Sequence, residues 1–292
     1  MVKKTASLNF IIFGRFMALF GKENSEKEMS FLEHLEVLRW HLVRIVSVIL
    51  IFGVVFFIFS RYIFDHVILV LAEEDFWTYQ QFCKLSHFLG LEDNLCMTDL
   101  KLNFQSISMS GQITTDLVVS LIGGFIVAFP YVFFEIWRFI APALKSKEKK
   151  YAAWTVFFST ILFVGGILFA YYLIAPLTVQ FLGNYQVSER VAINITINSY
   201  ITTVSTVILA CGIVFQLPLM VYFLSKMGIL TPEFMRKYRK HAIVITLILS
   251  AIITPPDISS QILVSLPILL LYEVSIFISA SVNKRKKKLA NG

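Results

Sequence analysis

The sequence predicts an all-α membrane protein, a bundle of six transmembrane helices with both termini on the cytoplasmic side. Hydrophobic residues make up 57% of the 292 residues and charged residues only 15%, and the mean hydropathy is +0.74. Soluble domains are roughly 45–50% apolar and about 25% charged. Long uncharged runs also alternate with short basic blocks. We therefore expect most of the chain to lie in hydrocarbon.

Each long uncharged run is interpreted as one crossing, because a helix that spans hydrocarbon uses roughly 20 residues. The expected spans are residues 45–60, 117–134, 152–175, 200–224, 242–254 and 258–280. The fifth run is short, since about 13 residues rising 1.5 Å each cover roughly 20 Å of a ~30 Å core. We expect the bilayer to thin locally at this helix.

The basic residues predict the orientation of these spans. They cluster before the first span, between the second and third, between the fourth and fifth, and at residues 284–288. The opposite side carries only Arg61, Lys84, Lys101 and Arg190. The positive-inside rule then places both termini in the cytoplasm. The net charge of +7 is thus a topology signal rather than a sign of nucleic-acid binding.

The chain divides into an N-terminal extension, a membrane domain and a basic tail. Residues 1–28 form the extension, which is expected to be cytoplasmic or interfacial. Arg15 interrupts its apolar stretch and no small-x-small cleavage site follows, so a signal peptide is not predicted. Met29 is a candidate start. The membrane domain covers 29–283, and the cytoplasmic tail covers 284–292.

Two loops are expected on the external side. The first, residues 61–116, is too long to be a simple turn, and the second covers residues 176–198. The last two spans are joined by a tight turn at Pro255, Pro256 and Asp257, because each proline fixes its own φ and restricts the preceding residue.

Three cysteines are present. Cys211 lies inside an apolar run, whereas Cys83 and Cys96 lie in the long polar segment. Only this second pair is placed to form a disulfide in an oxidising compartment.

Catalysis has no support in the sequence. Gly21 and Lys22, the only Gly-Lys pair, lack the rest of a phosphate-binding loop. The five histidines show no His-Glu-x-x-His spacing, and we interpret His34 and His41 as interfacial side chains rather than metal ligands. We therefore expect a protein that is not an enzyme and holds no metal or cofactor.

Three polar residues within the spans are functional candidates, because such groups are costly in hydrocarbon. Glu135 stands three residues before Arg138, which favours an interfacial ion pair. Gln216, next to Pro218, is expected either to stabilise the bundle by a hydrogen bond or to contact a partner helix. Glu273 is open to a structural or a translocation role.

Three carboxylates mark the cytoplasmic face. Glu33 and Glu36 precede the first span, and Glu148 follows the second, each among basic residues. Carboxylates with nearby cations usually form surface pairs of small energy. At the mouth of a bundle, however, they would also meet an incoming cationic peptide.

Four segments together resemble the TatC family of the twin-arginine translocation system. They are residues 31–39, residues 139–144 followed by Glu148, residues 215–218, and residues 254–261, which end at Gln261. The resemblance covers about residues 29–282. It implies a bundle of six helices with a concave, cup-like face in the bacterial cytoplasmic membrane.

The resemblance also implies a function. Such a protein binds the paired arginines of signal peptides and, with small single-span subunits of the TatA/TatB type, exports folded proteins under the proton-motive force. Glu148 is then an arginine-binding carboxylate, Phe139 and Pro142 shape its loop, and Arg39 lies in the same motif region. Gln216 corresponds to the polar position that contacts partner helices, with Pro218 beside it. An oligomeric complex surrounded by lipid is expected.

One departure from the family pattern affects the site. The family has a glutamate where this chain has Val37, and Glu36 is displaced by one residue. We expect Glu33 or Glu36 to replace it. The sequence also leaves two other classes open, a secondary solute transporter or channel and a non-transporting scaffold. Transporters often show inverted repeats, and the two halves of this chain show no convincing self-similarity.

Overall fold

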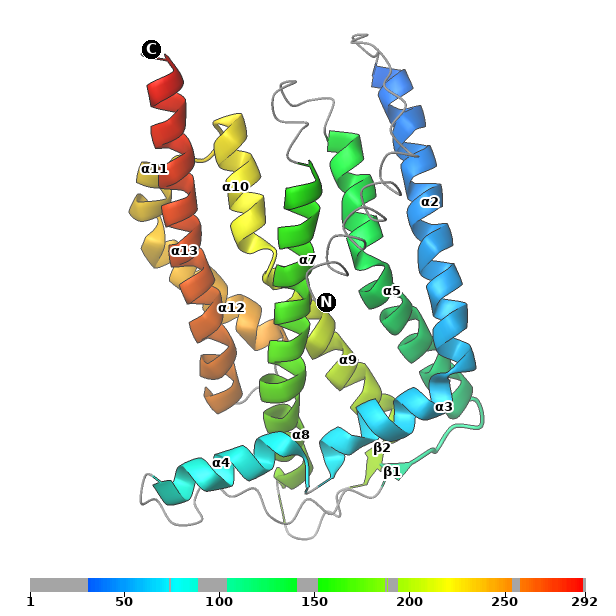
Figure 1. The fold of residues 1–292 in the computed structure, drawn as a ribbon. Helices are drawn as coiled ribbons and strands as arrows, with labels where there is room; N and C mark the ends of the chain where they lie inside the picture. Colours follow the sequence, from blue (N-terminus) through cyan, green and yellow to red (C-terminus); the bar gives the residue numbers. More distant parts are fainter. Residues whose placement is uncertain are drawn as a thin grey trace, which may run out of the picture. The chain divides into compact units, whose positions relative to one another are not determined.

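A computed structural model describes residues 31–73, 75–88, 104–140, 152–186, 188, 194–253 and 258–290. The chain divides into two compact units, Met1–Trp40 and His41–Gly292. Nearly all elements described below belong to the second unit, and they are labelled in Figure 1.

The first half of the chain holds two long helices separated by short external elements. In chain order these are α2 (Phe31–Ile58), α3 (Ser60–Ile63), the π-helix η1 (Phe64–Ile68), the 3₁₀-helix η2 (Leu69–Ala72), α4 (Trp77–Phe88), β1 (Phe104–Gln105) and α5 (Gly111–Ile140). Figure 1 shows α4 running crosswise to the long helices.

The second half is almost entirely helical. Its elements are α7 (Ala152–Phe169), the π-helix η4 (Ala170–Ile174), α8 (Ala175–Asn184), β2 (Ile195–Thr196), α9 (Ile197–Val214), α10 (Leu217–Met227), α11 (Pro232–Lys237), α12 (Arg239–Ile253) and α13 (Ile258–Ala290). The bundle is built by packing of α5 and α7 against α9, and of α10 and α12 against α13. A short parallel pairing joins β1 to β2.

Five helical segments among the described residues are long and apolar enough to cross a membrane. They are Leu35–Ile58, Gly111–Ile140, Trp154–Asn184, Ile197–Met227 and Gln261–Lys284. The sixth expected span falls in α12, whose 15 residues cover only about 22 Å at 1.5 Å per residue. The multi-pass character is therefore confirmed, whereas a sixth crossing is not.

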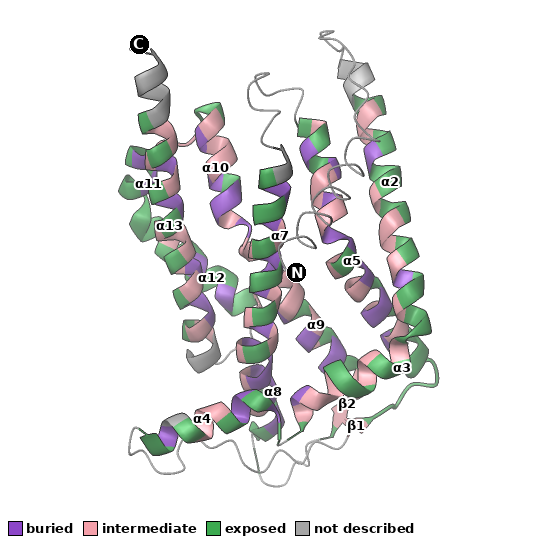
Figure 2. Ribbon diagram, viewed as in Figure 1, coloured by how far each residue is buried: buried purple, intermediate pink, exposed green. Residues whose placement is uncertain are grey.

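The long helices carry apolar side chains on their exposed faces. Val46, Leu50 and Val54 recur every four residues along α2, and each is at least half exposed. Ile262 and Leu266 on α13 repeat this pattern, and exposed positions follow each long helix in Figure 2. Such apolar surface is unfavourable in water and neutral in lipid, because lipid tails are themselves apolar.

The second external loop is shorter than expected. Residues 176–198 were expected to be loop, yet the helix continues through Pro176 to Asn184. Pro176 lies in the first turn of α8, directly after the π-helix η4. A proline is tolerated there because its missing N–H needs no partner within α8. The proline therefore does not end the span.

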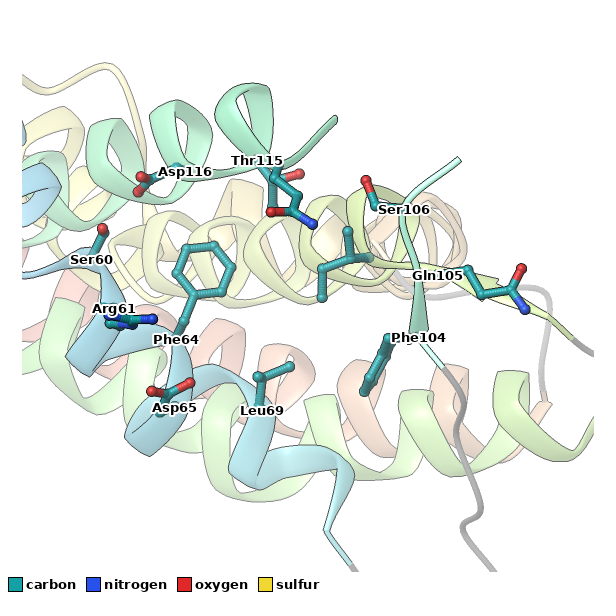
Figure 3. Close-up of a pocket in the computed structure, with 12 residues that line it drawn as sticks. Ser60, Arg61, Phe64, Asp65, Leu69, Phe104, Gln105, Ser106, Thr115 and Asp116 are labelled. Atoms are coloured by element: carbon teal, nitrogen blue, oxygen red, sulfur yellow. The ribbon is translucent and has the colours of Figure 1, made fainter. Parts of the chain in front are cut away.

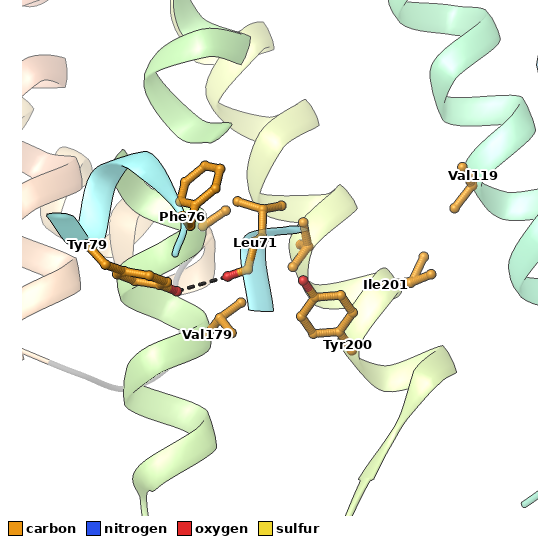
Figure 4. Close-up of a cluster of buried hydrophobic side chains, with 9 residues drawn as sticks. Leu71, Phe76, Tyr79, Val119, Val179, Tyr200 and Ile201 are labelled. Carbon is orange, nitrogen blue, oxygen red and sulfur yellow. Dashed lines mark hydrogen bonds between the residues drawn. The ribbon is translucent and has the colours of Figure 1, made fainter. Parts of the chain in front are cut away.

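The first external segment is also more ordered than a loop. Residues 61–116 contain α3, η1, η2, α4 and β1, and α5 begins within them at Gly111. A buried cluster joins this segment to the bundle, with Leu71 and Phe76 packed together with Val179 and Ile201 (Figure 4). Packing against helix ends therefore gives the segment its structure.

Tyr79 fastens α4 to this cluster. Its hydroxyl donates to the carbonyl of Leu71 at 2.9 Å, a bond drawn in Figure 4, and lies 3.2 Å from the carbonyl of Pro176. Burial raises the pKa of the Tyr79 phenol above its usual range. The phenol thus stays a neutral donor, which is the form that both carbonyl acceptors require.

The two long helices α2 and α5 approach each other closely. A Cβ added at Gly124 would lie 2.5 Å from the backbone nitrogen of Gly53 and 3.0 Å from the carbonyl oxygen of Ile49. Small residues allow this approach, as they do in many membrane helix pairs. Gly165 faces no such neighbour within 4 Å.

We predict that Gly124→Ala destabilises the protein, because the new methyl group would collide with the backbone of α2. Overpacking of this kind typically costs about 1–3 kcal/mol. The midpoint of thermal unfolding in detergent should therefore fall. Gly165→Ala is the matched control and should leave the midpoint unchanged or raise it, since alanine favours a helix by up to about 1 kcal/mol. Equal midpoints for both variants would contradict the close packing.

We also predict a disulfide between Cys83 and Cys96. Cys83 is disulfide-bonded in the structure and Cys211 is free and buried, whereas Cys96 lies outside the described residues. Closing a loop of this size stabilises the external segment by roughly 2–4 kcal/mol. Mass spectrometry of the unreduced protein should find one peptide pair containing both residues. Finding Cys83 and Cys96 as free thiols would refute the pairing.

Candidate functional site

The residues proposed for signal-peptide binding are only partly described. Glu36 and Arg39 are exposed on α2, and Phe139 is half-buried in the last turn of α5. The remaining predicted residues fall outside the described set: the side chain of Glu33, and Pro142, Glu148, Pro255, Pro256 and Asp257 as whole residues. Their roles stay predictions.

Gln216 lies at a break between two helices. α9 ends at Val214 and α10 begins at Leu217, with Pro218 in its first turn. Because proline has no N–H, it cannot continue the hydrogen bonding of α9. Just before this proline, the backbone N–H of Gln216 bonds to the carbonyl of Ile213, three residues earlier, at 3.0 Å. The break fixes the position of Gln216 along the axis of the span Ile197–Met227.

The amide of Gln216 is bonded within the chain. Its Oε1 accepts from the hydroxyl of Ser159 at 2.8 Å, and its Nε2 donates to the backbone carbonyl of Ser159 at 3.1 Å. Both residues are buried. These two hydrogen bonds tie the break between α9 and α10 to α7, as the bundle-stabilising interpretation requires. One amide hydrogen and one lone pair remain for a second partner.

Gln261 and Glu273 link α13 to α12. The amide of Gln261 donates to the carbonyl of Leu247 at 3.1 Å. Glu273 accepts from the guanidinium of Arg239 at 2.6 Å, and both side chains are nearly half exposed. Exposed ion pairs contribute about 0–1 kcal/mol. This pair therefore has a modest structural role.

A buried polar cluster that the sequence analysis did not predict joins α2 to α5. The Nδ1 of His41 bonds to Oε2 of Glu135. The hydroxyl of Tyr131 donates to Oε1 of Glu135 at 3.0 Å, and the guanidinium of Arg44 lies 3.8 Å from the same oxygen. Glu135 is 2% exposed and His41 is 7% exposed. One carboxylate is thus held from two helices.

Two predictions need correction here. Glu135 was expected to pair with Arg138, and His41 was interpreted as an interfacial side chain. The ion pairs recorded for Glu135 run instead to His41 and Arg44, while Arg138 is exposed. The reason is burial, because a carboxylate away from water needs partners that reach it in the interior.

The sequence did contain a signal for this cluster. His41 and Arg44 are three residues apart on one helix, and Tyr131 and Glu135 are four apart on another. Each spacing places both members on one helix face. Two polar pairs in different spans suggest a contact, although the sequence alone does not show that the two spans are neighbours.

A pocket of about 400 Å³ opens among α3, η1, β1 and the first turns of α5. Figure 3 shows its charged residues, Arg61, Asp65 and Asp116, around the ring of Phe64. Within the described part of the chain, Oδ1 of Asp116 is buried without a hydrogen-bond partner. The pocket is acidic overall and shares no residue with the predicted sites.

Metal binding finds no support in the described ranges. They contain no group of three His, Cys, Asp or Glu side chains that could hold an ion. The described chemistry is therefore that of hydrogen-bonded and charged side chains between helices.

Comparisons with known proteins agree on one family. The family model described as Sec-independent protein translocase protein (TatC) matches residues 33–267. The protein named TatC from Blattabacterium sp. subsp. Periplaneta americana is 37% identical over 265 residues, which cover 90% of this chain and all of that protein. TatC from Aquifex aeolicus is 33% identical over 262 residues, covering 89% and 99%.

A solved structure supports the same assignment. The crystal structure described as Twin Arginine Translocase Receptor TatC matches with a TM-score of 0.66 and 33% identity, covering 86% of this chain and 99% of that chain. These matches favour a translocase component over a solute transporter, a channel, a passive scaffold or a catalytic enzyme. The chain is a multi-pass membrane protein that belongs to the TatC family of Sec-independent protein translocase proteins.

Proposed function

We propose that this protein binds the paired arginines of signal peptides at its cytoplasmic face. The observation that carries the proposal is its likeness to a structure described as the twin-arginine translocase receptor, over 86% of this chain. With small single-span subunits of the TatA/TatB type, the protein supports export of folded proteins driven by the proton-motive force.

The chemistry of arginine recognition supports this proposal. A guanidinium binds a carboxylate through two parallel hydrogen bonds, which a lysine ammonium does not reproduce. We assign Glu148 as one such carboxylate and Glu33 or Glu36 as the second, in place of the family glutamate at Val37. Phe139 and Pro142 shape the adjoining loop. Two carboxylates thus match the two arginines.

The topology follows from charge placement. We propose that both termini lie in the cytoplasm of a bacterial cell and that the protein sits in the inner membrane, with a concave, cup-like face. This orientation requires α12 to cross a locally thinned bilayer together with its flanking turn at Pro255, Pro256 and Asp257. The basic residues before α2 and at the end of α13 then lie on the cytoplasmic side, as the positive-inside rule requires.

We further propose that Gln216, beside Pro218, contacts a helix of a single-span partner in an oligomeric complex. A buried glutamine can bond to Ser159 and still use its second amide hydrogen. Interhelical hydrogen bonds of this kind contribute about 0.6–2 kcal/mol in membranes. That is enough to bias the docking of one helix.

The receptor role predicts that Glu148→Gln weakens binding of a twin-arginine peptide to the purified protein. Each hydrogen bond to a charged group is worth roughly 1.5–3 kcal/mol, so the affinity should fall at least about tenfold. Glu33→Gln and Glu36→Gln should each be partly tolerated, because either carboxylate can reach a flexible guanidinium. The double change should approach the loss seen for Glu148→Gln.

Two controls accompany this titration. Glu233→Gln removes an exposed carboxylate in the first turn of α11 and should bind like the wild type. A twin-lysine peptide should bind weakly to every variant. If the Glu33/Glu36 double variant keeps wild-type affinity, these residues are only helix-start charges that interact with the macrodipole.

The docking role predicts that Gln216→Leu lowers recovery of single-span subunits and transport while sparing peptide binding. Ser159→Ala is the matched comparison, because it removes the 2.8 Å bond to Gln216 yet leaves the amide in place. Co-purification and transport should be close to normal for Ser159→Ala. Equal defects in both variants would mean that the internal bond, rather than a partner contact, is what transport needs.

A further inference from the structure

The cluster of His41 and Glu135 is costly to bury, and this cost suggests that the cluster has a function. Ionisable groups within a span are disfavoured by several kcal/mol unless they are paired. Here Glu135 is held by His41 and Arg44 from α2 and by Tyr131 from its own helix. Polar contacts of this kind help to pair α2 with α5 in lipid, where apolar contacts distinguish poorly between neighbouring helices. The position of the cluster on α5 points to a second role.

The cluster shares a helix face with Phe139. Tyr131, Glu135 and Phe139 follow one another at four-residue spacing, so their side chains form one row along α5. Opposite this row stands His41, whose ring meets the ring of Phe139 edge to face with centroids 6.0 Å apart. The imidazole therefore touches both the carboxylate and the aromatic ring.

The bond to Glu135 fixes the orientation of the imidazole. With Nδ1 directed at the carboxylate, the ring cannot rotate about χ2 without losing a bond to a buried charged group. A fixed imidazole limits the positions open to the Phe139 ring. Phe139 in turn is the penultimate residue of α5, directly before the segment that carries Pro142 and Glu148.

We propose that His41, held by Glu135, is a positioning residue that sets the ring of Phe139 for contact with the signal peptide. This inference rests on the proposed receptor function. The charged and titratable groups around the pair are Arg44 from α2, and Tyr131 and Arg138 from α5. The sequence analysis assigned no role to Arg44 or Tyr131.

A double-mutant cycle on peptide affinity tests the proposal. His41→Leu and Phe139→Ala should each weaken binding of a twin-arginine peptide about tenfold, equivalent to about 1.4 kcal/mol. If His41 acts through Phe139, the double variant should also lose only about tenfold, because the two effects are one. A loss near a hundredfold would mean independent effects and would overturn the proposal.

A conservative variant separates positioning from general stability. In His41→Asn the side-chain nitrogen takes nearly the place of Nδ1 and can still donate to Glu135. This variant keeps a bond to Glu135 but lacks the ring that meets Phe139, so its affinity should fall about tenfold, as for His41→Leu. Wild-type affinity for His41→Asn would mean that the imidazole ring does not position Phe139, and the proposal would fail.

Two further variants keep the test informative if His41→Leu does not fold. Tyr131→Phe removes only the hydroxyl that donates to Glu135, and its loss of about threefold should disappear in the Phe139→Ala background. Ser279→Ala breaks a buried 2.8 Å bond between α10 and α13 and should leave affinity unchanged. An additive Tyr131→Phe effect would overturn the proposal even if His41→Leu does not fold.

The wild-type titration distinguishes the two levels of inference. If the wild-type protein binds twin-arginine and twin-lysine peptides equally, the receptor function itself is wrong. If it prefers the twin-arginine peptide but the cycles are additive, the receptor function stands and only the positioning role of His41 is lost.

Discussion

The structure depends on one constraint, the absence of water around most of the chain. A polar group in hydrocarbon has to find its partner inside the protein. In this chain the partners come from other helices: Gln216, at the break between α9 and α10, bonds to Ser159 on α7, and Glu135 from α5 bonds to His41 on α2. Apolar contacts distinguish poorly between helix neighbours in lipid. Polar pairs and close backbone approaches therefore select which helices pack together.

The pairing of α2 with α5 combines a polar contact with a close approach of the two backbones. Gly124 lets the backbones approach so closely that a Cβ there would lie only 2.5 Å from the backbone nitrogen of Gly53. Toward the other end of the same helix pair, His41 and Arg44 reach the carboxylate of Glu135. Two contacts separated along a helix fix both its rotation about its own axis and its position along that axis relative to the partner helix. Such a pair gives the last turn of α5, with Phe139, a defined place.

The break at Gln216 also specifies a contact between helices, through the missing N–H of a proline. Pro218 stops the hydrogen bonding of α9, and the next helix restarts around Gln216. The amide of Gln216 lies at this break and makes two hydrogen bonds to Ser159. The break between α9 and α10 is thereby joined to α7 by a specific contact.

The segment between α2 and α5 is ordered in a different way. Its short helices and the two-residue pairing of β1 with β2 have little stability of their own. They are held by a cluster that includes Leu71 and Phe76, and by the hydroxyl of Tyr79. Segments with weak local preference can thus be ordered by packing onto the ends of long helices.

The sequence by itself determined the membrane class, because hydropathy is a local property that any run of about 20 residues displays. It predicted six spans, of which five correspond to helices long and apolar enough to cross a membrane. It also showed the four segments that resemble the TatC family. It did not determine the continuation of a helix through Pro176, since the preceding π-helix is a matter of backbone geometry. Only the tertiary structure decided that His41 meets Glu135, 94 residues away, and that Ser159 meets Gln216, 57 residues away. Residue spacing specifies the face of one helix on which a side chain lies, whereas its partner depends on which helices become neighbours, and that is fixed by packing of the whole bundle.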